Sequence, residues 1–402
     1  MPHHVVFLPQ RQPGVHPMKI TALKLHDACF PYEDAALATE GTWDYEDFFT
    51  PERRDWVDKW ISFDCLLADD QRDVIWCGIA SFKSDIFWVY DRRNGEFRSM
   101  NYPAVADPFD AKFHRSLAFD PQGQIWAATA RYHDADREMD SPGGAIVKID
   151  PDTEQIEIID RPMPHVYIQS IILDADRRAL YGQTYHPEYL FRYDIDTRQC
   201  RILASLSGGI ALAQAEQLAM DRNGTVWGTY GAGRAWGNSP GPKPFRLLRY
   251  QPDDDDVTFL KTGLPRLDGA GYARQDGMHT GPDGAVYIGT VEGLLCRIDP
   301  DTTDVSVIGK PAPGQRLTAM ANGPDGCMYG SCGRHGAANL FRLEPRSGRL
   351  ENLGPVFDRS LAIQAWQLHD MAITADGTIY GGENDVPHRS SYLWEIAGAN
   401  GA

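Results

Sequence analysis

The sequence predicts an all-β protein, and three features lead to that prediction: apolar residues that alternate with polar ones, turns rich in Gly, Asp and Asn, and a repeat along the chain. Each repeat begins with an apolar strand, continues through a turn and ends in a second strand that carries Trp or Tyr. Clear copies are SLAFDPQGQIWAAT (116–129), QLAMDRNGTVWGTY (217–230), TGPDGAVYIGT (280–290), NGPDGCMYGSC (322–332) and MAITADGTIYGGE (371–383), and weaker ones are LLADDQRDVIWCG (66–78) and IILDADRRALYGQT (171–184).

A third strand with an Asp-rich turn follows each hairpin, as in AIVKIDPDT, and most copies add a short fourth strand such as QIEIID. Four alternating strands, repeated every 42 to 60 residues or so, are typical of propeller blades. The seven copies therefore predict a seven-bladed β-propeller of four-stranded antiparallel blades.

The last copy ends at YLWEIAGANGA without a fourth strand, whereas an isolated strand, KITALKLHD (19–27), precedes the first copy. We expect this N-terminal strand to complete the last blade and close the ring, so that residues 18–402 form one domain. Residues 1–17 are expected to be a disordered leader. Residues 30–59 form an insertion that we expect to cap one face, with PERRDWVDKW as a short helix begun at Pro51.

Composition excludes several classes of partner. The 402 residues carry a formal net charge of −17, which repels nucleic acid and anionic membrane surfaces. No apolar run approaches the roughly 20 residues that cross a bilayer, and no secretory signal is recognisable, so we expect a cytoplasmic protein. The seven cysteines are odd in number and contain no C-x-x-C pair, which argues against a disulfide framework and a zinc ribbon. The oligomeric state stays open.

Common catalytic motifs are absent too. The sequence has no G-x-S-x-G, H-E-x-x-H, Walker A or EF-hand pattern and no G-x-G-x-x-G between strand and helix. We therefore expect no nucleotide, flavin or haem.

The repeat places polar residues at one equivalent position near the start of each inner strand, where a propeller lines its channel. These residues are Asp64, Arg115, Gln169, Glu216, Asp276, Thr318 and His369. A second set, from the loops of the same face, is His133, Tyr185, His186, Tyr230, Arg234, Trp236, Glu292, Arg334, His335, Glu383, Asn384, Asp385, His388 and Arg389. Such a density of chemistry-bearing side chains indicates a functional face, although a hydrated channel without chemistry remains the alternative.

Two residue pairs stand out on this face. His369 and Glu383 begin and end one hairpin, so they could hold a divalent cation (Mg²⁺, Mn²⁺ or Ca²⁺), orient His369 as a base, or simply stabilise the blade. His114 and His133 stand in the same relation on another hairpin. Arginine beside an aromatic or histidine, as at Arg234 and Trp236, is typical of a platform for a sugar or an anion, or is merely an exposed loop charge.

The segment HDMAITADGTIYGGE resembles the blade repeats of streptogramin B lyase. The resemblance implies that His369 is the base and Glu383 a magnesium ligand; the family's second metal-binding histidine falls at Thr318. The His114 and His133 arrangement is similar to that of ulvan lyases and rhamnose–glucuronate lyases, which carry a tyrosine and an arginine where this chain has Gln169 and Tyr185. By that resemblance Tyr185 becomes the base or acid and Arg234 the neutralising group.

Both resemblances imply β-elimination, for which a histidine base, a tyrosine acid and a neutralised carboxylate are suitable. We therefore expect a lyase that cleaves a uronic-acid-containing oligosaccharide or a similar anionic substrate. The alternatives are a non-catalytic propeller that binds a glycan or a protein, and a metal-dependent hydrolase or lactonase that uses Glu216, Asp276 and His369.

The predicted site residues fall into three groups. The predicted catalytic residues are His369, His114, His133 and Tyr185. The predicted substrate-binding residues are Arg115, Gln169, His186, Tyr230, Arg234, Trp236, Arg334, His335, His388 and Arg389. The predicted metal ligands are Glu383, Glu216 and Asp276.

Overall fold

The structure is a computed structural model that describes residues 18–29, 59–82, 85–130, 139–185, 187–208, 216–232, 245–269 and 271–399. These residues form β-strands, with a 3-10 helix at Tyr102–Ala104, and they contain no α-helix, which confirms the all-β prediction. In the same residues no helix is long and apolar enough to cross a membrane. The predicted leader and the predicted helix at Pro51 lie outside the described residues.

Antiparallel units of four strands follow one another along the chain; the short strand β6 (Lys112–Phe113) joins the first two into one nine-stranded sheet, and the short strand β15 (Ser207–Gly208) adds a parallel strand to the fourth. The first unit contains β2 (Ile61–Asp69), β3 (Val74–Ser81), β4 (Phe87–Asp91) and β5 (Glu96–Ser99), and the second contains β7 (Ala118–Phe119), β8 (Ile125–Ala130), β9 (Ile146–Asp150) and β10 (Gln155–Asp160). The third unit contains β11 (Tyr167–Asp174), β12 (Ala179–Tyr185), β13 (Tyr189–Asp194) and β14 (Cys200–Ser205). The fourth contains β16 (Ala219–Met220), β17 (Val226–Ala232), β18 (Phe245–Gln251) and β19 (Asp256–Phe259). The others are β22 (Gln275–Thr280), β23 (Val286–Thr290), β24 (Leu295–Ile298) and β25 (Val305–Gly309); β26 (Leu317–Asn322), β27 (Met328–Cys332), β28 (Asn339–Glu344) and β29 (Arg349–Pro355); and β32 (Leu368–Ile373), β33 (Ile379–Glu383) and β34 (Leu393–Ala397) with β1 (Lys19–Leu23).

The N-terminal strand β1 pairs antiparallel with β34, with Lys19 opposite Ala397 and Leu23 opposite Leu393. The first and last described strands of the chain therefore share one sheet. Short strands complete the framework: β6 (Lys112–Phe113), β15 (Ser207–Gly208), β20 (Leu264–Pro265), β21 (Tyr272–Ala273), β30 (Phe357–Asp358) and β31 (Ile363–Gln364).

The recurring Asp and Trp or Tyr of the repeat have a common structural role, because the turn carboxylate accepts a hydrogen bond from the aromatic side chain of the second strand. The contacts are Trp76 to Asp69 (3.1 Å), Trp126 to Asp120 (3.0 Å), Tyr181 to Asp174 (3.4 Å), Trp227 to Asp221 (2.8 Å), Tyr287 to Asp283 (3.2 Å) and Tyr329 to Asp325 (2.9 Å). A hydrogen bond to a charged group contributes about 1.5–3 kcal/mol, so each contact stabilises its hairpin locally.

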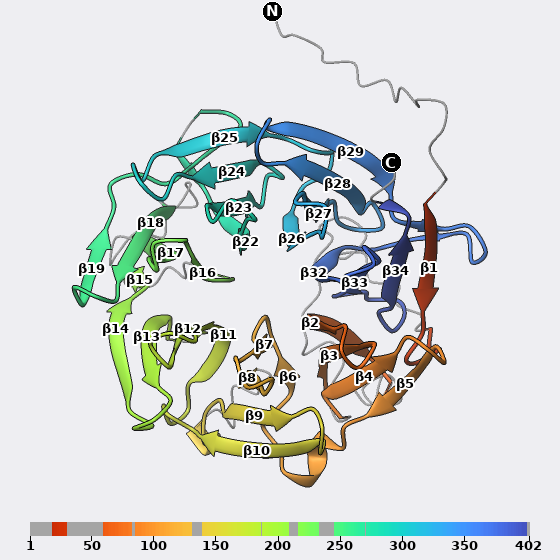
Figure 1. Ribbon diagram of the computed structural model, residues 1–402, viewed down its shortest axis with the longest axis horizontal. Coiled ribbons are helices and arrows are strands. Elements are labelled where there is room, and N and C mark those ends of the chain that lie inside the picture. The colour runs from red at the N-terminus through yellow and green to blue at the C-terminus, as the bar shows by residue number, and fades with distance from the viewer. Residues whose placement is uncertain are drawn as a thin grey trace, which may run out of the picture.

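The sheets are arranged around a central axis, with β2, β7, β11, β16, β22, β26 and β32 nearest to it (Figure 1). Apolar clusters lie between neighbouring sheets, so the core is a series of interfaces around the ring. One cluster, for example, joins Trp126 and Ile146 to Leu180 and Phe191 of the next sheet. In this propeller-like arrangement the inner strands line the axis (Figure 1).

A register irregularity marks the position that the repeat predicts as polar. In β2, β11, β22, β26 and β32 the pairing shifts at the residue named in the sequence alignment: Asp64, Gln169, Asp276, Thr318 and His369. A β-bulge re-aims the side chain of its extra residue, which is why bulges often occur next to functional sites. Arg115 and Glu216 instead precede the short inner strands β7 and β16.

Candidate functional site

Two histidines that are 255 residues apart in the chain meet at the central axis. The Nε2 atoms of His114 and His369 are 2.7 Å apart, and the side chains are only 3% and 4% exposed. The short strand β6, which lies between β3 and β8, ends immediately before His114, whereas His369 occupies the bulge of β32. Sequence reasoning paired these histidines with His133 and Glu383, so their mutual contact is a new finding; His133 lies outside the described residues.

Arg115 fixes the pair from one side. Its five N–H groups have acceptors in Nε2 and the carbonyl of His369, the side chain of Gln217 and the carbonyls of Asp276 and Thr318, at 2.9–3.3 Å. Because no N–H group remains for a ligand, the structure places Arg115 as an internal brace between sheets and not as the substrate-binding residue that we predicted.

The contacts define which nitrogens carry protons. The carbonyl of Gln169 can only accept, so Nδ1 of His114 (2.7 Å away) carries the proton and Nε2 keeps a lone pair. Arg115 can only donate, so Nε2 of His369 keeps a lone pair as well. If both rings are neutral, Arg115 engages the lone pair of His369 Nε2, and the lone pair of His114 Nε2 is free to take up a proton, which would then lie between the two rings.

The surroundings keep this proton off at neutral pH. Burial lowers the pKa of His114 well below its usual range, and the Lys112 and Arg115 charges lower it further. Burial and then Arg115 and His114 do the same to the pKa of His369. Both buried imidazoles are therefore neutral, and Nε2 of His114 is available as a base.

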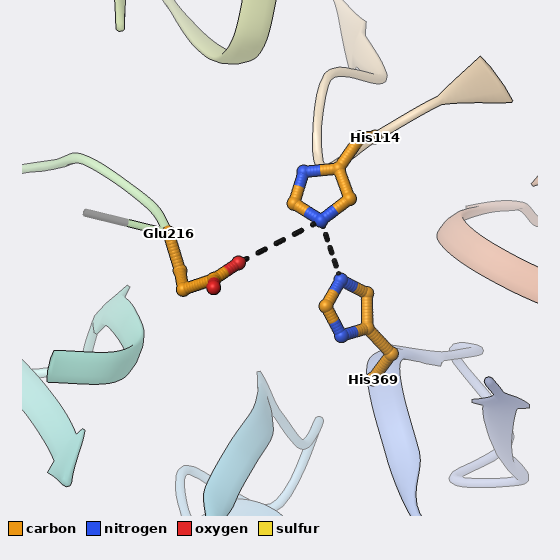
Figure 2. Close-up of side chains that lie close together, drawn as sticks. All are labelled: His114, Glu216 and His369. Atoms are coloured by element: carbon orange, nitrogen blue, oxygen red, sulfur yellow. Dashed lines mark hydrogen bonds and ion pairs between the residues drawn. The ribbon is translucent and has the colours of Figure 1, made fainter. Parts of the chain in front are cut away.

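Glu216 completes the centre from a third sheet. Figure 2 shows its carboxylate turned toward the histidine pair, 3.8 Å from Nε2 of His114. The side-chain amide of Gln169 donates to the same Glu216 oxygen at 3.4 Å. Ligand atoms of His114, Glu216 and His369 all lie within 4.8 Å of one another, which makes them the group that could hold a metal among the described residues. The guanidinium of Arg115 against His369 opposes a cation there.

Asp276 does not join this group, although we predicted it as a metal ligand. Its carboxylate is fully buried and accepts hydrogen bonds from Nε and Nη2 of Arg316 at 2.6–3.0 Å. Burial alone would raise the pKa of Asp276, but Arg316 outweighs it and the pKa is lowered. Asp64 is the contrasting case, because burial raises its pKa to about 7 with Lys112 no nearer than 4.0 Å.

Glu383 cannot act as the metal ligand that the family resemblance implies. Arg389 donates to both carboxylate oxygens at 2.7 Å, and the backbone N–H groups of Trp366 and Tyr392 donate to one each at 2.7 and 2.8 Å. With all its lone pairs engaged in the interior, this carboxylate does not fit a cation. The structure thus makes Glu383 and Arg389 a buried ion pair that shapes the loop.

The remaining predicted residues are spread over the face. Tyr185 ends β12 with its ring 5.5 Å from that of Tyr167. The rings of His335 and His388 flank Trp366, at 5.3 and 5.4 Å.

Two predicted residues have contacts of a different kind. Arg334 donates to Gln315, whereas Tyr230 packs on Phe259 and donates to the carbonyl of Leu260, away from the histidine pair. His186, Arg234 and Trp236 lie outside the described residues.

Some residues near the site have a strained backbone. Arg115, Arg316, His335 and Asp385 have φ between 43° and 67°, in the left-handed region. Such conformations cost about 1–3 kcal/mol each in non-glycine residues and tend to occur at functional sites.

Sequence reasoning missed Lys112, Arg274, Arg316 and Trp366. A usable signal existed for two of them, because Arg274 and Arg316 stand two residues before the aligned positions Asp276 and Thr318. Their equal spacing from the aligned positions is a pattern to which the alignment could have been extended.

Comparison with solved structures supports the propeller assignment. Virginiamycin B lyase from Staphylococcus aureus, a streptogramin B lyase solved as an inactive variant with quinupristin, matches with a TM-score of 0.60 at 14% identity, over 94% of this chain and 99% of that chain. The extracellular domain of a hybrid two-component system from B. thetaiotaomicron matches with a TM-score of 0.55 at 15% identity, over 85% of this chain and 40% of that chain. No family model and no curated protein matches the sequence. The chain therefore shares the fold of propeller-like proteins and resembles streptogramin B lyase in fold.

Proposed function

We propose that the protein is a lyase that cleaves a uronic-acid-containing oligosaccharide by β-elimination, with the His114–His369 pair as its base. The observation that carries the proposal is the 2.7 Å contact between the Nε2 atoms of two buried imidazoles. A pair of this kind accepts one proton, and its lowered pKa values keep it unprotonated until substrate binds.

The chemistry needs three contributions from the chain. An arginine neutralises the substrate carboxylate, which acidifies the neighbouring C–H bond. The imidazole pair then takes that proton while the electron pair forms a C=C bond and the C–O bond to the leaving sugar breaks. Tyr185, at the same end of its hairpin as Gln169, donates the proton to the departing oxygen.

The proposal extends to the setting of the reaction. We propose a ring of seven blades closed by the β1–β34 pairing, in a cytoplasmic protein whose substrate is a small anionic glycan. The net charge of −17 supports a partner other than nucleic acid or an anionic membrane.

The test is the ultraviolet absorbance of the unsaturated product across a panel of uronic-acid oligosaccharides. We expect a rising signal with the wild type and its loss in His114→Gln and His369→Gln, since each variant removes one member of the base. His26→Gln is the matched control, because His26 contacts Trp88 of β4 and is not part of the site. Absence of product with every uronide, or unchanged rates in both site variants, would refute the proposal.

A second candidate is a metal-dependent hydrolase or lactonase, which the grouping of His114, Glu216 and His369 favours. Two imidazoles and a carboxylate are the donor set that transition metals prefer. Metal analysis of the purified protein separates the candidates: a stoichiometric cation that Glu216→Gln removes supports the hydrolase, and a metal-free protein that forms product supports the lyase.

A further inference from the structure

Three arginines, Arg274, Arg316 and Arg334, lie around the buried carboxylate of Asp276, close enough to influence one another's charge. Backbone hydrogen bonds hold them in one row: the Val291 N–H group donates to the Arg274 carbonyl, the Arg316 N–H group donates to the Val291 carbonyl, and the Gly333 N–H group donates to the Arg316 carbonyl. Arg334 directly follows Gly333. The row crosses from the sheet of β22 to the sheet of β26, so backbone hydrogen bonds between the two sheets hold the three arginines at fixed positions.

Most of the N–H groups in this row are not used within the protein. Arg316 directs Nε and Nη2 to Asp276. Arg334 donates once, to the uncharged side chain of Gln315. Among the described residues, the side chain of Arg274 has no hydrogen-bond partner and Nη1 of Arg316 has none either. Arginine carries five N–H donors, so the row offers a surplus of them.

The charge balance points the same way. Asp276 is already neutralised by Arg316, and Glu216 and Asp385 act on Arg316 across space. Arg334 has no carboxylate partner among the residues described, and burial and then the charge of Arg316 lower its pKa, which is the sign of a cation that lacks a counter-ion. An arginine without a counter-ion of its own favours an anionic ligand beside it.

We propose that Arg274, Arg316 and Arg334 form an anion site that binds the carboxylate group of a sugar acid. Arginine suits this ligand, because its planar fork matches the two oxygens of a carboxylate. The site adjoins the base, since Asp276, which pairs with Arg316 through its carboxylate, accepts a hydrogen bond from Arg115 through its carbonyl at 2.9 Å. Its role in neutralising the substrate carboxylate during elimination rests on the proposed function. Its ability to bind a carboxylate does not depend on turnover.

Calorimetric titration with D-glucuronate tests the site without chemistry, because the free sugar has no leaving group. We expect glucuronate to bind and glucose not to bind, and Arg274→Gln and Arg334→Gln each to weaken glucuronate binding about tenfold through loss of a charged contact. Added salt is expected to weaken binding. The control is Arg93→Gln, whose side chain is 65% exposed and pairs with Asp91 outside the site.

Equal binding of glucose and glucuronate, or unchanged affinity in both site variants, would overturn the anion site. Tighter binding of inorganic phosphate or sulfate than of glucuronate would overturn the assignment to a carboxylate. Failure of the lyase proposal looks different: glucuronate binds and the variants weaken it, yet no uronide gives an unsaturated product. Product formation with unchanged KM in both variants would refute the anion site and leave the lyase.

Discussion

Replacing Arg115 with methionine is the sharpest test of how the centre is held together. Methionine keeps much of the side-chain volume but removes all five hydrogen bonds. The acceptors that it leaves behind belong to Gln217, Asp276, Thr318 and His369, and the last three are buried and come from separate sheets. The change therefore acts on the assembly of the sheets and not on one strand.

The magnitude follows from these contacts. A buried acceptor left without a partner costs about 1–3 kcal/mol, although carbonyls can recover part of this by rearrangement or hydration. We therefore expect a loss of about 4 kcal/mol, which for a cooperative chain of 402 residues lowers Tm by about 5 °C.

Thermal unfolding of the wild type, Arg115→Met and the exposed control Arg93→Met measures this loss, and the control should stay within about 0.5 kcal/mol. A second readout is the titration of His369: after burial, the charge of Arg115 is the largest cause of its lowered pKa, so the pKa should rise in the variant. A Tm within about 1 °C of the wild type together with an unchanged His369 titration would refute the role assigned to Arg115.

Three further outcomes are expected. Burial raises the pKa of Asp64 to about 7, so the folded state holds this proton more tightly than the unfolded chain does. The free energy of unfolding should therefore fall by about 4 kcal/mol between about pH 4 and pH 7. Unfolding measured across this pH range should show a flatter profile in Asp64→Asn. Glu383→Gln should lose about 3–5 kcal/mol of unfolding free energy in denaturant, because Arg389 is left as an unpaired buried charge. Added Mg²⁺ should not stabilise the wild type through Glu383. A rise in Tm with Mg²⁺ that the wild type shows and the variant lacks would contradict this. Trp227→Phe should lose about 1.5–3 kcal/mol through its hydrogen bond to Asp221, and an unchanged denaturation midpoint would count against the role assigned to the repeated turn.

The all-β architecture was predictable because its cause is local and repeated. Six of the hairpins carry a turn Asp and an aromatic residue that hydrogen-bond to each other, as Asp69 and Trp76 do, so the same letters recur wherever the same turn forms. The position of Asp64, Gln169, Asp276, Thr318 and His369 was predictable for the same reason, since their bulges fall at equivalent places in five inner strands.

The partners of these residues were not predictable from the repeat. A repeat aligns residues within a blade, but the contacts at the axis join blades that are far apart in the sequence, as His114 and His369 are. Loop contacts follow no period either, and Glu383 is paired with Arg389 only because a loop of irregular conformation turns back on β33. The alignment therefore identifies which residues face the axis, whereas their chemistry depends on the distances between blades.

The position of Arg115 links the stability of the centre to its basicity. The same guanidinium that connects the sheets of Asp276, Thr318 and His369 also places a positive charge beside the imidazole pair and so holds its pKa down. Without the charge of Arg115 the pKa of His369 would be higher, so the imidazole would be a stronger base but partly protonated. Arg115→Lys separates the two effects, because lysine keeps the charge and loses the planar fork: it should lower Tm while the His369 pKa stays low. If both quantities change together as in Arg115→Met, the charge of Arg115 is not what controls the base.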